Sequence, residues 1–334
     1  MLIWVNRGIV EMETIILAVL MAFVFALGSG RVIIPILKRL KAGQQIRDDG
    51  PKTHLAKAGT PTMGGIMILL SVIIVAVIFI KKVSMYLWLA LIGATAYGLI
   101  GLLDDLIIVL KHRSLGLRPW QKIFMQLFFA ILISVYAYRD PNIGSVLYVP
   151  MIGTYIDLGI WYIPFCIFFL LSVTNCVNLA DGLDGLAGGV TIINSATFAL
   201  IFIATFPTAV WAGDMALFSS ALTGGVLGFL RYNMYPAQVI MGDLGAFFLG
   251  GALAMVAVIS RMELLIPVMG LMFVLSGLSC ILQVGSYKLR KKRIFKMAPL
   301  HHHFELSGVP ETRIVSAYMI VTVVTCLLTM LLIK

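Results

Sequence analysis

The chain has 334 residues, of which 60% are hydrophobic and 12% charged, with a mean hydropathy of +1.02 and a formal net charge of +10. Soluble domains are about 45–50% apolar and about 25% charged, so the composition excludes a water-soluble protein, a disordered chain and a soluble dinucleotide-binding fold. Roughly 20 apolar residues cross a bilayer as a helix, and the length leaves room for about ten crossings joined by short loops.

The apolar residues are grouped into ten segments along the chain. These segments cover residues 14–37, 63–80, 86–109, 123–138, 158–177, 188–206, 214–231, 244–260, 264–287 and 313–333. The first is too long for a signal-peptide core and is therefore expected to be a membrane helix. No internal repeat and no long polar insertion interrupts the series. The sequence thus predicts an all-α integral membrane protein with a single polytopic domain over residues 1–334.

The basic residues predict the orientation of these helices. With the loops assigned alternately to two sides, 18 of the 25 Lys and Arg lie on one side, within 38–62, 110–122 and 288–313 and at Arg231. Arg31 is inside the first helix, and the other side holds only Arg7, Lys81, Lys82, Arg139, Arg261 and Lys334. The positive-inside rule makes the richer side cytoplasmic and both termini extracytoplasmic. The net charge follows from this rule alone, or it also attracts anionic substrates.

One expected external loop, residues 140–159, has the pattern of a short β-hairpin. It contains the β-prone stretches SVLYV and TYID on either side of Pro150 and Gly153. Alternating residues bounded by Pro and Gly are typical of paired strands. We expect this hairpin to cap the outer face.

Five aspartates are expected at cytoplasmic helix ends. Asp104 and Asp105 close the third segment, Asp181 and Asp184 lie between the fifth and sixth, and Asp243 opens the eighth. Adjacent ionised carboxylates repel each other, and a cation relieves that repulsion. Mg²⁺ prefers oxygen ligands and is usually held by one or two carboxylates together with substrate phosphates. The pattern predicts a magnesium-phosphate site, whereas the plainer reading is that Asp104 and Asp105 simply end a helix in headgroup water.

Three further motifs have the chemistry of an anion site. In NCVNLADGLDGLAGG, the polar residues Asn175, Asn178, Asp181 and Asp184 recur every third position, so neighbouring members can face one ligand on a helix. KAGTPTMGG, which begins at Lys57, offers a cation, hydroxyls and accessible backbone amides, although it is not a Walker A sequence. APLHHHFE contains three consecutive histidines that do not have the spacing of a helical zinc pair. Imidazoles there would hydrogen-bond phosphate oxygens or metal-bound water.

The motifs KAGTPTMGG, GLLDD, NCVNLADGLDGLAGG, MGDLG and APLHHHFE, in this order, resemble those of the phospho-N-acetylmuramoyl-pentapeptide-transferase family. That family belongs to the polyprenyl-phosphate N-acetylhexosamine-1-phosphate transferases. The likeness spans Lys57 to Glu305, and PLHHHFE is the more characteristic of the muramoyl-pentapeptide branch. The resemblance implies transfer of phospho-MurNAc-pentapeptide from UDP-MurNAc-pentapeptide to undecaprenyl phosphate, which yields lipid I and UMP in peptidoglycan biosynthesis.

The resemblance also implies Mg²⁺ as cofactor, a homodimer, and a multi-pass location in the bacterial inner membrane with the active site facing the cytoplasm. No nucleic-acid partner is expected. By motif position, Asp243 resembles the principal Mg²⁺ ligand, and the catalytic set is Asp104, Asp105, Asp243 and His302. The substrate contacts are Lys57, Thr62, Asn178, Asp184 and Gln283, with Asp181 and His303 lining the same cleft. The ninth helix is expected to bend around a groove for the lipid, which Pro267, Gly270 and Gly277 would permit.

The sequence departs from the family pattern at two positions of the expected site. Ile108 stands where a lysine commonly follows the aspartate pair, so that role is vacant or passes to Lys111 or Lys122. Ile240 stands where an aromatic residue often precedes the M-G-D motif and stacks on uracil. Neither change removes a carboxylate.

Rival functions are distinguished by chemistry. A relative within the wider family would transfer GlcNAc-1-phosphate instead. A secondary transporter also combines many helices with acidic residues, but its site usually lies near the bilayer midplane between repeated halves. For the transfer itself, direct attack by the dianionic lipid phosphate is favoured over a covalent aspartyl-phosphate on Asp104 or Asp105, because a phosphate monoester needs little help from a base at pH 7.

Overall fold

A computed structural model of the chain describes residues 12–40, 43, 57, 59–80, 83–111 and 116–333. Arg7, Lys81, Lys82 and Lys334, which were assigned to the outer side, lie outside these residues. The first elements are α1 (Met12–Arg39), α2 (Gly65–Ile78), α3 (Met85–Lys111), α4 (Pro119–Arg139), β1 (Val146–Val149), β2 (Thr154–Asp157), η3 (Gly159–Trp161) and α5 (Tyr162–Ala180). The remaining elements are α6 (Leu186–Ala204), α7 (Ala212–Asn233), α8 (Gly242–Ser260), η4 (Glu263–Leu265), α9 (Ile266–Met269), α10 (Leu271–Arg290), α11 (Leu300–Glu305) and α12 (Glu311–Leu332).

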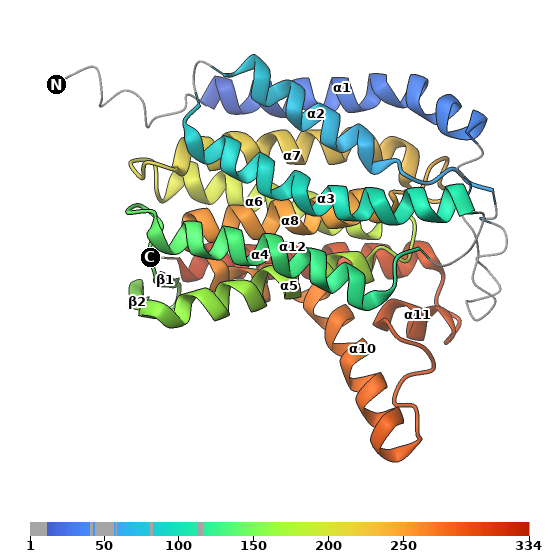
Figure 1. Cartoon of the computed structure of the whole chain (residues 1–334). Helices are drawn as coiled ribbons and strands as arrows, with labels where there is room; N and C mark the ends of the chain where they lie inside the picture. The colour runs from blue at the N-terminus through green and yellow to red at the C-terminus, as the bar shows by residue number, and fades with distance from the viewer. Residues whose placement is uncertain are drawn as a thin grey trace.

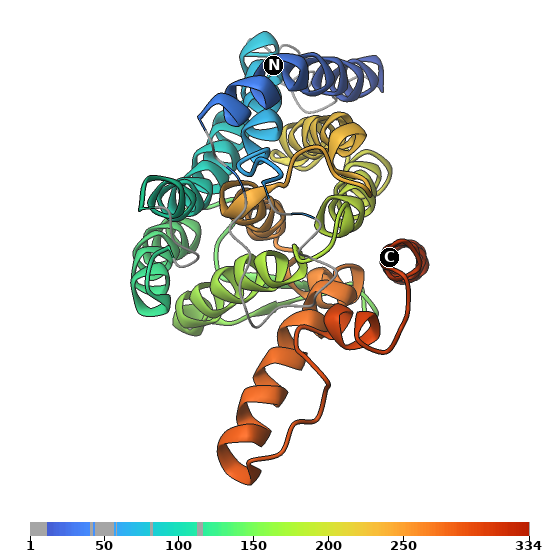
Figure 2. The ribbon, with the colours of Figure 1, turned by 90° about the vertical axis from the view of Figure 1, so that its right-hand side faces the viewer.

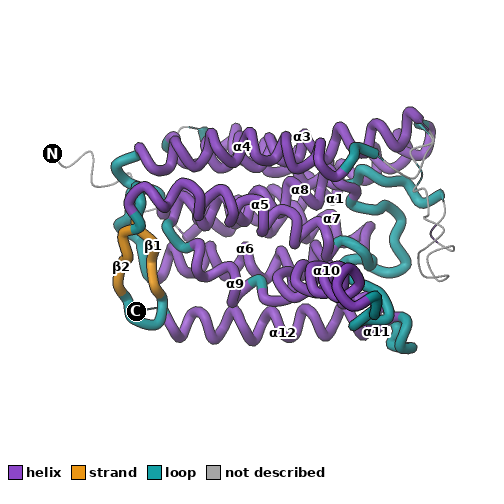
Figure 3. The backbone as a smooth tube through the Cα atoms, turned by 60° about the horizontal axis from the view of Figure 1, so that its bottom comes forward, coloured by secondary structure: helices purple, strands orange, loops and turns teal. Residues whose placement is uncertain are grey.

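The long helices lie side by side in one bundle (Figure 1). The β1–β2 hairpin lies at one end of this bundle and α11 at the other, as Figure 3 shows. Within the described residues, nine helices are long and apolar enough to cross a membrane. The prediction of an all-α membrane protein is therefore confirmed.

Each of the ten predicted apolar segments contains a helix, but the second is shorter than expected. The prediction covered 63–80, whereas α2 has 14 residues, from Gly65 to Ile78. At about 1.5 Å per residue this helix is roughly 21 Å long, against a hydrocarbon core of about 30 Å. Met63 and Gly64, which were expected at its start, instead belong to a non-helical stretch with Pro61 and Thr62 that makes backbone hydrogen bonds to the functional site described below.

The ninth predicted segment is broken, as expected from its glycines and proline. It forms η4, the single turn α9 and then α10, with Gly270 as the joint between the last two. Beyond this joint α10 leaves the bundle and projects outward (Figures 1 and 2). Gly277 permits close contact with α5, because a Cβ there would lie 2.4 Å from the Cys176 sulfur.

The core of the bundle is formed by α8. Every residue of this helix from Leu244 to Ser260 is buried, and it packs against α3, α5 and α2. Small residues allow the close approach: a Cβ at Gly250 would lie 2.7 Å from the Thr174 Cα of α5. In lipid, where apolar surface alone does not drive helix association, such close contact stabilises helix pairs. The central position of α8 brings its first turn to the ends of several neighbouring helices.

The expected hairpin is also present. β1 and β2 pair antiparallel, with Val146 opposite Asp157 and Val149 opposite Thr154. The Tyr148 amide donates to the Arg261 carbonyl, which fixes the hairpin to the chain just after α8. The hairpin thus covers the end of the bundle opposite α11 (Figure 3).

Candidate active site

The site begins with the close packing of α3 against the first turn of α8. A Cβ at Gly101 would lie 2.1 Å from the Asp243 carbonyl oxygen, so only glycine permits this approach. One helical turn further on, the carboxylate of Asp105 accepts the backbone amides of Asp243, at 3.2 Å, and Leu244, at 2.9 Å. Asp105 therefore caps α8 from a neighbouring helix, and its negative charge matches the positive end of the α8 dipole.

A glycine turn fixes the chain just before Asp243. Gly242 has φ +76°, and a Cβ there would contact the Asp105 carboxylate and the Thr62 hydroxyl at 2.7 and 2.8 Å. The preceding residues pair with the KAGTPTMGG motif: the Ile240 amide donates to the Pro61 carbonyl at 2.8 Å, and the Gly64 amide donates to the Ile240 carbonyl at 2.9 Å. The backbone thus places the buried Thr62 beside the M-G-D turn.

Lys122 joins two of the predicted carboxylates. From the first turn of α4, its ammonium lies 3.0 Å from Asp104 Oδ2 and 2.6 Å from Asp243 Oδ2. Asn178, near the end of α5, donates from Nδ2 to the other Asp243 oxygen at 3.0 Å. Lys111, the alternative lysine, is exposed at the end of α3. Four helices therefore converge on a cluster of Asp104, Lys122, Asn178 and Asp243, here called the α8 cluster.

A second cluster brings together three distant parts of the chain. Lys57 donates to Asp184 at 2.8 Å and to Glu311, the first residue of α12, at 2.7 Å. Burial alone would lower the pKa of the Lys57 ammonium, but the hydrogen bonds and charges of Asp184 and Glu311 outweigh burial and raise it. Sequence reasoning found Lys57 and Asp184 but missed Glu311, because a glutamate at a helix start is an ordinary feature.

Asp181 connects the two clusters electrostatically. Burial is the largest effect on this carboxyl group, and the charges of Asp243 and Asp184 add to it, so that the pKa of Asp181 is raised to about 7. The positive charge of Lys57 opposes the shift. The five predicted aspartates thus lie in one region. Asp104 and Asp243 are joined through Lys122, Asp105 caps α8, Asp184 belongs to the second cluster, and the charges of both clusters act on Asp181.

The histidine motif forms α11 and packs beside the DGLDG loop. A Cβ at Gly182 would lie 2.3 Å from His301 Nε2 and 3.1 Å from His302 Nε2. His302 Nδ1 lies 3.0 Å from Glu305. The structure therefore places His302 next to the loop that contains Asp181 and Asp184.

Gln283 and His303 have a different environment from the aspartates. The Gln283 side chain accepts the backbone amides of Ile294 and Phe295, and His303 Nδ1 accepts the Lys296 amide at 3.1 Å. Both side chains hold the loop between α10 and α11 in the form described here. Their predicted contact with substrate would require these hydrogen bonds to be exchanged.

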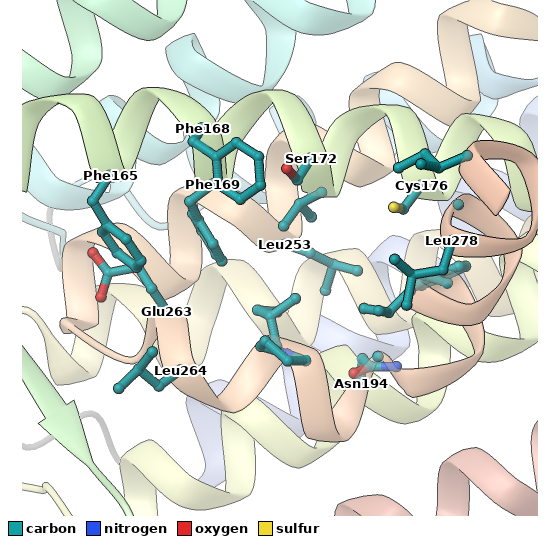
Figure 4. A pocket seen from close by; sticks show the side chains of 18 residues that line it. Phe165, Phe168, Phe169, Ser172, Cys176, Asn194, Leu253, Glu263, Leu264 and Leu278 are labelled. Atoms are coloured by element: carbon teal, nitrogen blue, oxygen red, sulfur yellow. The ribbon is translucent and has the colours of Figure 1, made fainter. Parts of the chain in front are cut away.

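An apolar cavity of about 280 Å³ lies between α5 and α10 (Figure 4). Its walls include Phe165, Phe169 and Phe273. At one end it reaches Glu263, and along α5 it reaches Cys176, two residues before Asn178. Helix α5 therefore contributes both to this cavity and to the α8 cluster, although none of the four cluster residues lines the cavity.

The α8 cluster has the donors that a divalent cation requires. Among the described residues, no group of three or more His, Cys, Asp and Glu is arranged around a common metal position. Mg²⁺ does not need such a group, since it keeps several waters and binds one or two carboxylates plus substrate phosphates. The Lys122 ammonium already shows that Asp104 and Asp243 are spaced to hold one positive charge between them. These residues fit Mg²⁺ bound together with a phosphate substrate.

The fold and the site define a polytopic membrane protein with a carboxylate–lysine centre at one end of its helices, suited to phosphate-bearing substrates. Residues 87–261 match the family model described as glycosyl transferase family 4, and residues 57–69 match the phospho-N-acetylmuramoyl-pentapeptide-transferase signature 1.

Full-length relatives agree with these matches. A phospho-N-acetylmuramoyl-pentapeptide-transferase of Clostridium kluyveri is 46% identical over 316 residues, which are 95% of this chain and 98% of the relative. The enzyme of the same name from Caldanaerobacter subterraneus subsp. tengcongensis is 48% identical over 312 residues, 93% of this chain and 96% of the relative. The chain therefore belongs to the phospho-N-acetylmuramoyl-pentapeptide-transferase family.

Proposed function

We propose that the protein transfers phospho-MurNAc-pentapeptide from UDP-MurNAc-pentapeptide to undecaprenyl phosphate, giving lipid I and UMP. The observation that carries this proposal is the α8 cluster, in which two carboxylates and one ammonium meet, and whose helix α5 also lines an apolar cavity. Phosphoryl transfer depends chiefly on positioning and on neutralising charge, and this cluster supplies groups for both. The relatives and the family model are named as transferases, which supports the same function.

The donor is proposed to occupy the region between the two clusters. Its pyrophosphate would lie at Asp243 and Lys122, and its nucleoside near Lys57, Thr62, Asn178 and Asp184. Lys122 takes the cationic role that Ile108 leaves vacant, since its ammonium already contacts both carboxylates. Asp181, His302, His303 and Gln283 would complete the cleft.

Asp104 and Asp243 are proposed to hold Mg²⁺, with Asp243 as the principal ligand. When bound, the metal neutralises charge on the pyrophosphate and leaving group. The chain's own residues do the rest: Lys122 steadies the phosphate oxygens, and Asp104 orients the acceptor phosphate or removes its residual proton. Asp105 contributes by holding the first turn of α8, because both of its oxygens are occupied by backbone amides.

The acceptor lipid is proposed to lie in the apolar cavity along α5 and α10. The cavity walls are almost entirely hydrocarbon and aromatic, and Cys176 marks the end nearer to Asn178. A polyprenyl chain seated there would present its phosphate toward Asp104 and Asp243. Direct attack by that phosphate follows naturally from this arrangement.

The location and assembly are also proposals. The α8 cluster, Lys57 and α11 would face the cytoplasm of a bacterium, with the chain in the inner membrane and both termini outside. This assignment is supported by the excess of Lys and Arg on that side. The homodimer stays a prediction from the family resemblance.

Purified protein in detergent with Mg²⁺, undecaprenyl phosphate and one donor tests the function. We expect UDP-MurNAc-pentapeptide to give UMP and a lipid-linked product of matching mass, and UDP-GlcNAc to give neither. Product from UDP-GlcNAc alone would favour the GlcNAc-1-phosphate alternative. A transporter is disfavoured because Asp243 lies in the first turn of α8, and Asp104 and Asp105 lie about two turns from the C-terminal end of α3, rather than at the middle of either helix.

A further inference from the structure

Glu311 occupies an unusual place for the first residue of a membrane helix. Its side chain is only 11% exposed, and it faces the loops at the site end of the bundle. Its Oε1 accepts two hydrogen bonds, from the Lys57 ammonium at 2.7 Å and from the Asp184 backbone amide at 2.6 Å. One oxygen of α12 thus contacts two segments that are remote from it in the sequence.

Lys57 and Asp184 are themselves paired, so the three side chains form a closed unit. The second oxygen of Asp184 accepts the Ala237 amide at 2.9 Å, which extends the unit to the segment that leads into α8. The next amide, that of Gly185, donates to Asn233 at the end of α7. These hydrogen bonds tie the DGLDG loop to the Lys57 motif, to α7 and to the segment before α8, and among those shown for Asp184 the bond to Glu311 is the only one contributed by α12.

The charges of the Lys57, Asp184 and Glu311 side chains explain how Glu311 fixes the position of Lys57. Lys57 is a long, flexible side chain, and holding it in one rotamer costs conformational entropy. A carboxylate on each side of the ammonium limits it to one position, because charge-assisted hydrogen bonds are shorter and stronger than neutral ones. Glu311 is also favourably placed with respect to the α12 dipole, since acidic groups stabilise helix N-termini.

We propose that Glu311 is a positioning residue for the nucleotide end of the donor site, acting through Lys57 and the Asp184 loop. This inference rests on the proposed function for its kinetic consequence. Glu311 holds Lys57 and the Asp184 amide in the arrangement that the donor meets. The last membrane helix thereby helps to build a site whose other members come from the Lys57 motif, α3, α4, α5, the DGLDG loop, α8, α10 and α11.

Substitutions of Glu311 separate its shape from its charge. Gln retains an oxygen at the position of Oε1, whereas Ala removes it and Asp, being one methylene shorter, cannot reach both donors. We expect Glu311→Ala and Glu311→Asp to raise the KM for UDP-MurNAc-pentapeptide about tenfold or more, with the KM for undecaprenyl phosphate unchanged. Glu311→Gln should restore the donor KM to within about threefold of wild type. Thr312→Ala, an exposed neighbour on the same turn, is the matched control and should behave as wild type.

A double-mutant cycle tests whether Glu311 acts through Lys57. The effect of Glu311→Ala on the donor KM should be largely lost when Lys57 is already Ala, because residues that act as a unit are not additive. Additive effects of the two substitutions, an unchanged donor KM in Glu311→Ala, or an equal rise in both KM values would each overturn the proposal.

A measurement without substrate keeps this inference separate from the proposed function. Lys57 in wild-type protein should react slowly with an amine-directed acylating reagent, as read by mass spectrometry. Its labelling should be about tenfold faster in Glu311→Ala and unchanged in Thr312→Ala. Equal labelling in all three proteins would contradict the positioning role even if lipid I is formed. Faster labelling without any transferase activity would support the positioning role while rejecting the function.

Discussion

The ammonium of Lys122 lies 2.6 Å from Oδ2 of Asp243, which joins the first turn of α4 to the first turn of α8. The same ammonium is 3.0 Å from Asp104. A cation thus already occupies the space between the buried carboxylate of Asp104 and the partly buried carboxylate of Asp243. If a divalent ion binds these carboxylates together with a phosphate, the Lys122 ammonium must move away from Asp104 and Asp243. It can then donate hydrogen bonds to the phosphate oxygens.

Lys122→Gln should therefore change metal binding and turnover in opposite directions. Without the Lys122 ammonium, the negative charges of Asp104 and Asp243 are no longer neutralised. Mn²⁺, used as a spectroscopic substitute for Mg²⁺, should therefore bind about tenfold more tightly. Turnover should fall, because the cation that steadies the phosphates is gone. Electron paramagnetic resonance titration measures the first effect, and UMP release the second. Lys111→Gln is the control, and weaker Mn²⁺ binding in Lys122→Gln would refute the competition.

Asp105 and Asp243 should differ in their effect on stability. Asp105→Asn removes one of two acceptor oxygens that cap α8, which typically costs about 1 kcal/mol, and the thermal midpoint in detergent should fall. Asp243→Asn gives up the charge of its ion pair with Lys122 but also relieves repulsion among nearby carboxylates, so its midpoint should fall by less than that of Asp105→Asn. A lower midpoint for Asp243→Asn than for Asp105→Asn would reverse the assigned roles.

Asp181 predicts a pH dependence of nucleotide binding in the absence of metal. Burial raises its pKa to about 7, so the group is largely neutral at pH 6 and ionised at pH 8. An ionised Asp181 repels a diphosphate, and the Kd for UDP measured in EDTA should rise across this interval. Asp181→Asn should show a flatter profile than wild type over the same range. An identical slope in both proteins would show that another group is responsible.

Glu263 predicts a pH dependence of stability at the opposite end of the bundle. It is buried beside the apolar cavity and accepts the Tyr162 hydroxyl at 2.8 Å, and burial raises its pKa to about 8. The unfolded chain ionises near pH 4.5 but the folded chain retains the proton, so stability is fully present below about pH 4.5 and is lost as the pH rises toward 8. Above pH 8 no further loss from this group is expected.

Glu263→Gln should lack this loss. The difference between the thermal midpoints of the variant and of wild type should shift in favour of the variant from pH 5 to pH 8 and then stay constant. A constant difference over the whole range would show that Glu263 does not retain its proton in the folded protein.

The sequence was sufficient to predict the helices because membrane crossing imposes a strong constraint on composition. The segments at 244–260 and 313–333 differ from α8 and α12 by no more than two residues at either end. The bend in the ninth segment was also predictable, since Pro267 and Gly270 disfavour a continuous helix. The short α2 was not, because Met63 and Gly64 are as apolar as the helix that follows, and only tertiary pairing with Ile240 removes them from it.

The sequence predicts which types of residue form the site, but not every pair of side chains that contact each other there. The aspartates stand out because carboxylates are rare beside membrane helices. The choice between Lys111 and Lys122 depends on how α4 packs, and the sequence has no local signal for it. Glu311 was missed for the same reason, since its partner Lys57 is separated from it by nearly the whole chain. The sequence singles out Asp105 because it adjoins Asp104. Only the packing of α8 against α3 shows that its carboxylate caps α8.

The most direct test of the account is UMP release from UDP-MurNAc-pentapeptide and undecaprenyl phosphate, titrated with Mg²⁺, for wild type and Asp243→Asn. Wild type should saturate with Mg²⁺ and stop in EDTA, whereas the folded variant should be slower by at least about 100-fold at every Mg²⁺ concentration. Turnover by Asp243→Asn near the wild-type rate would contradict the assignment of the reaction to the α8 cluster.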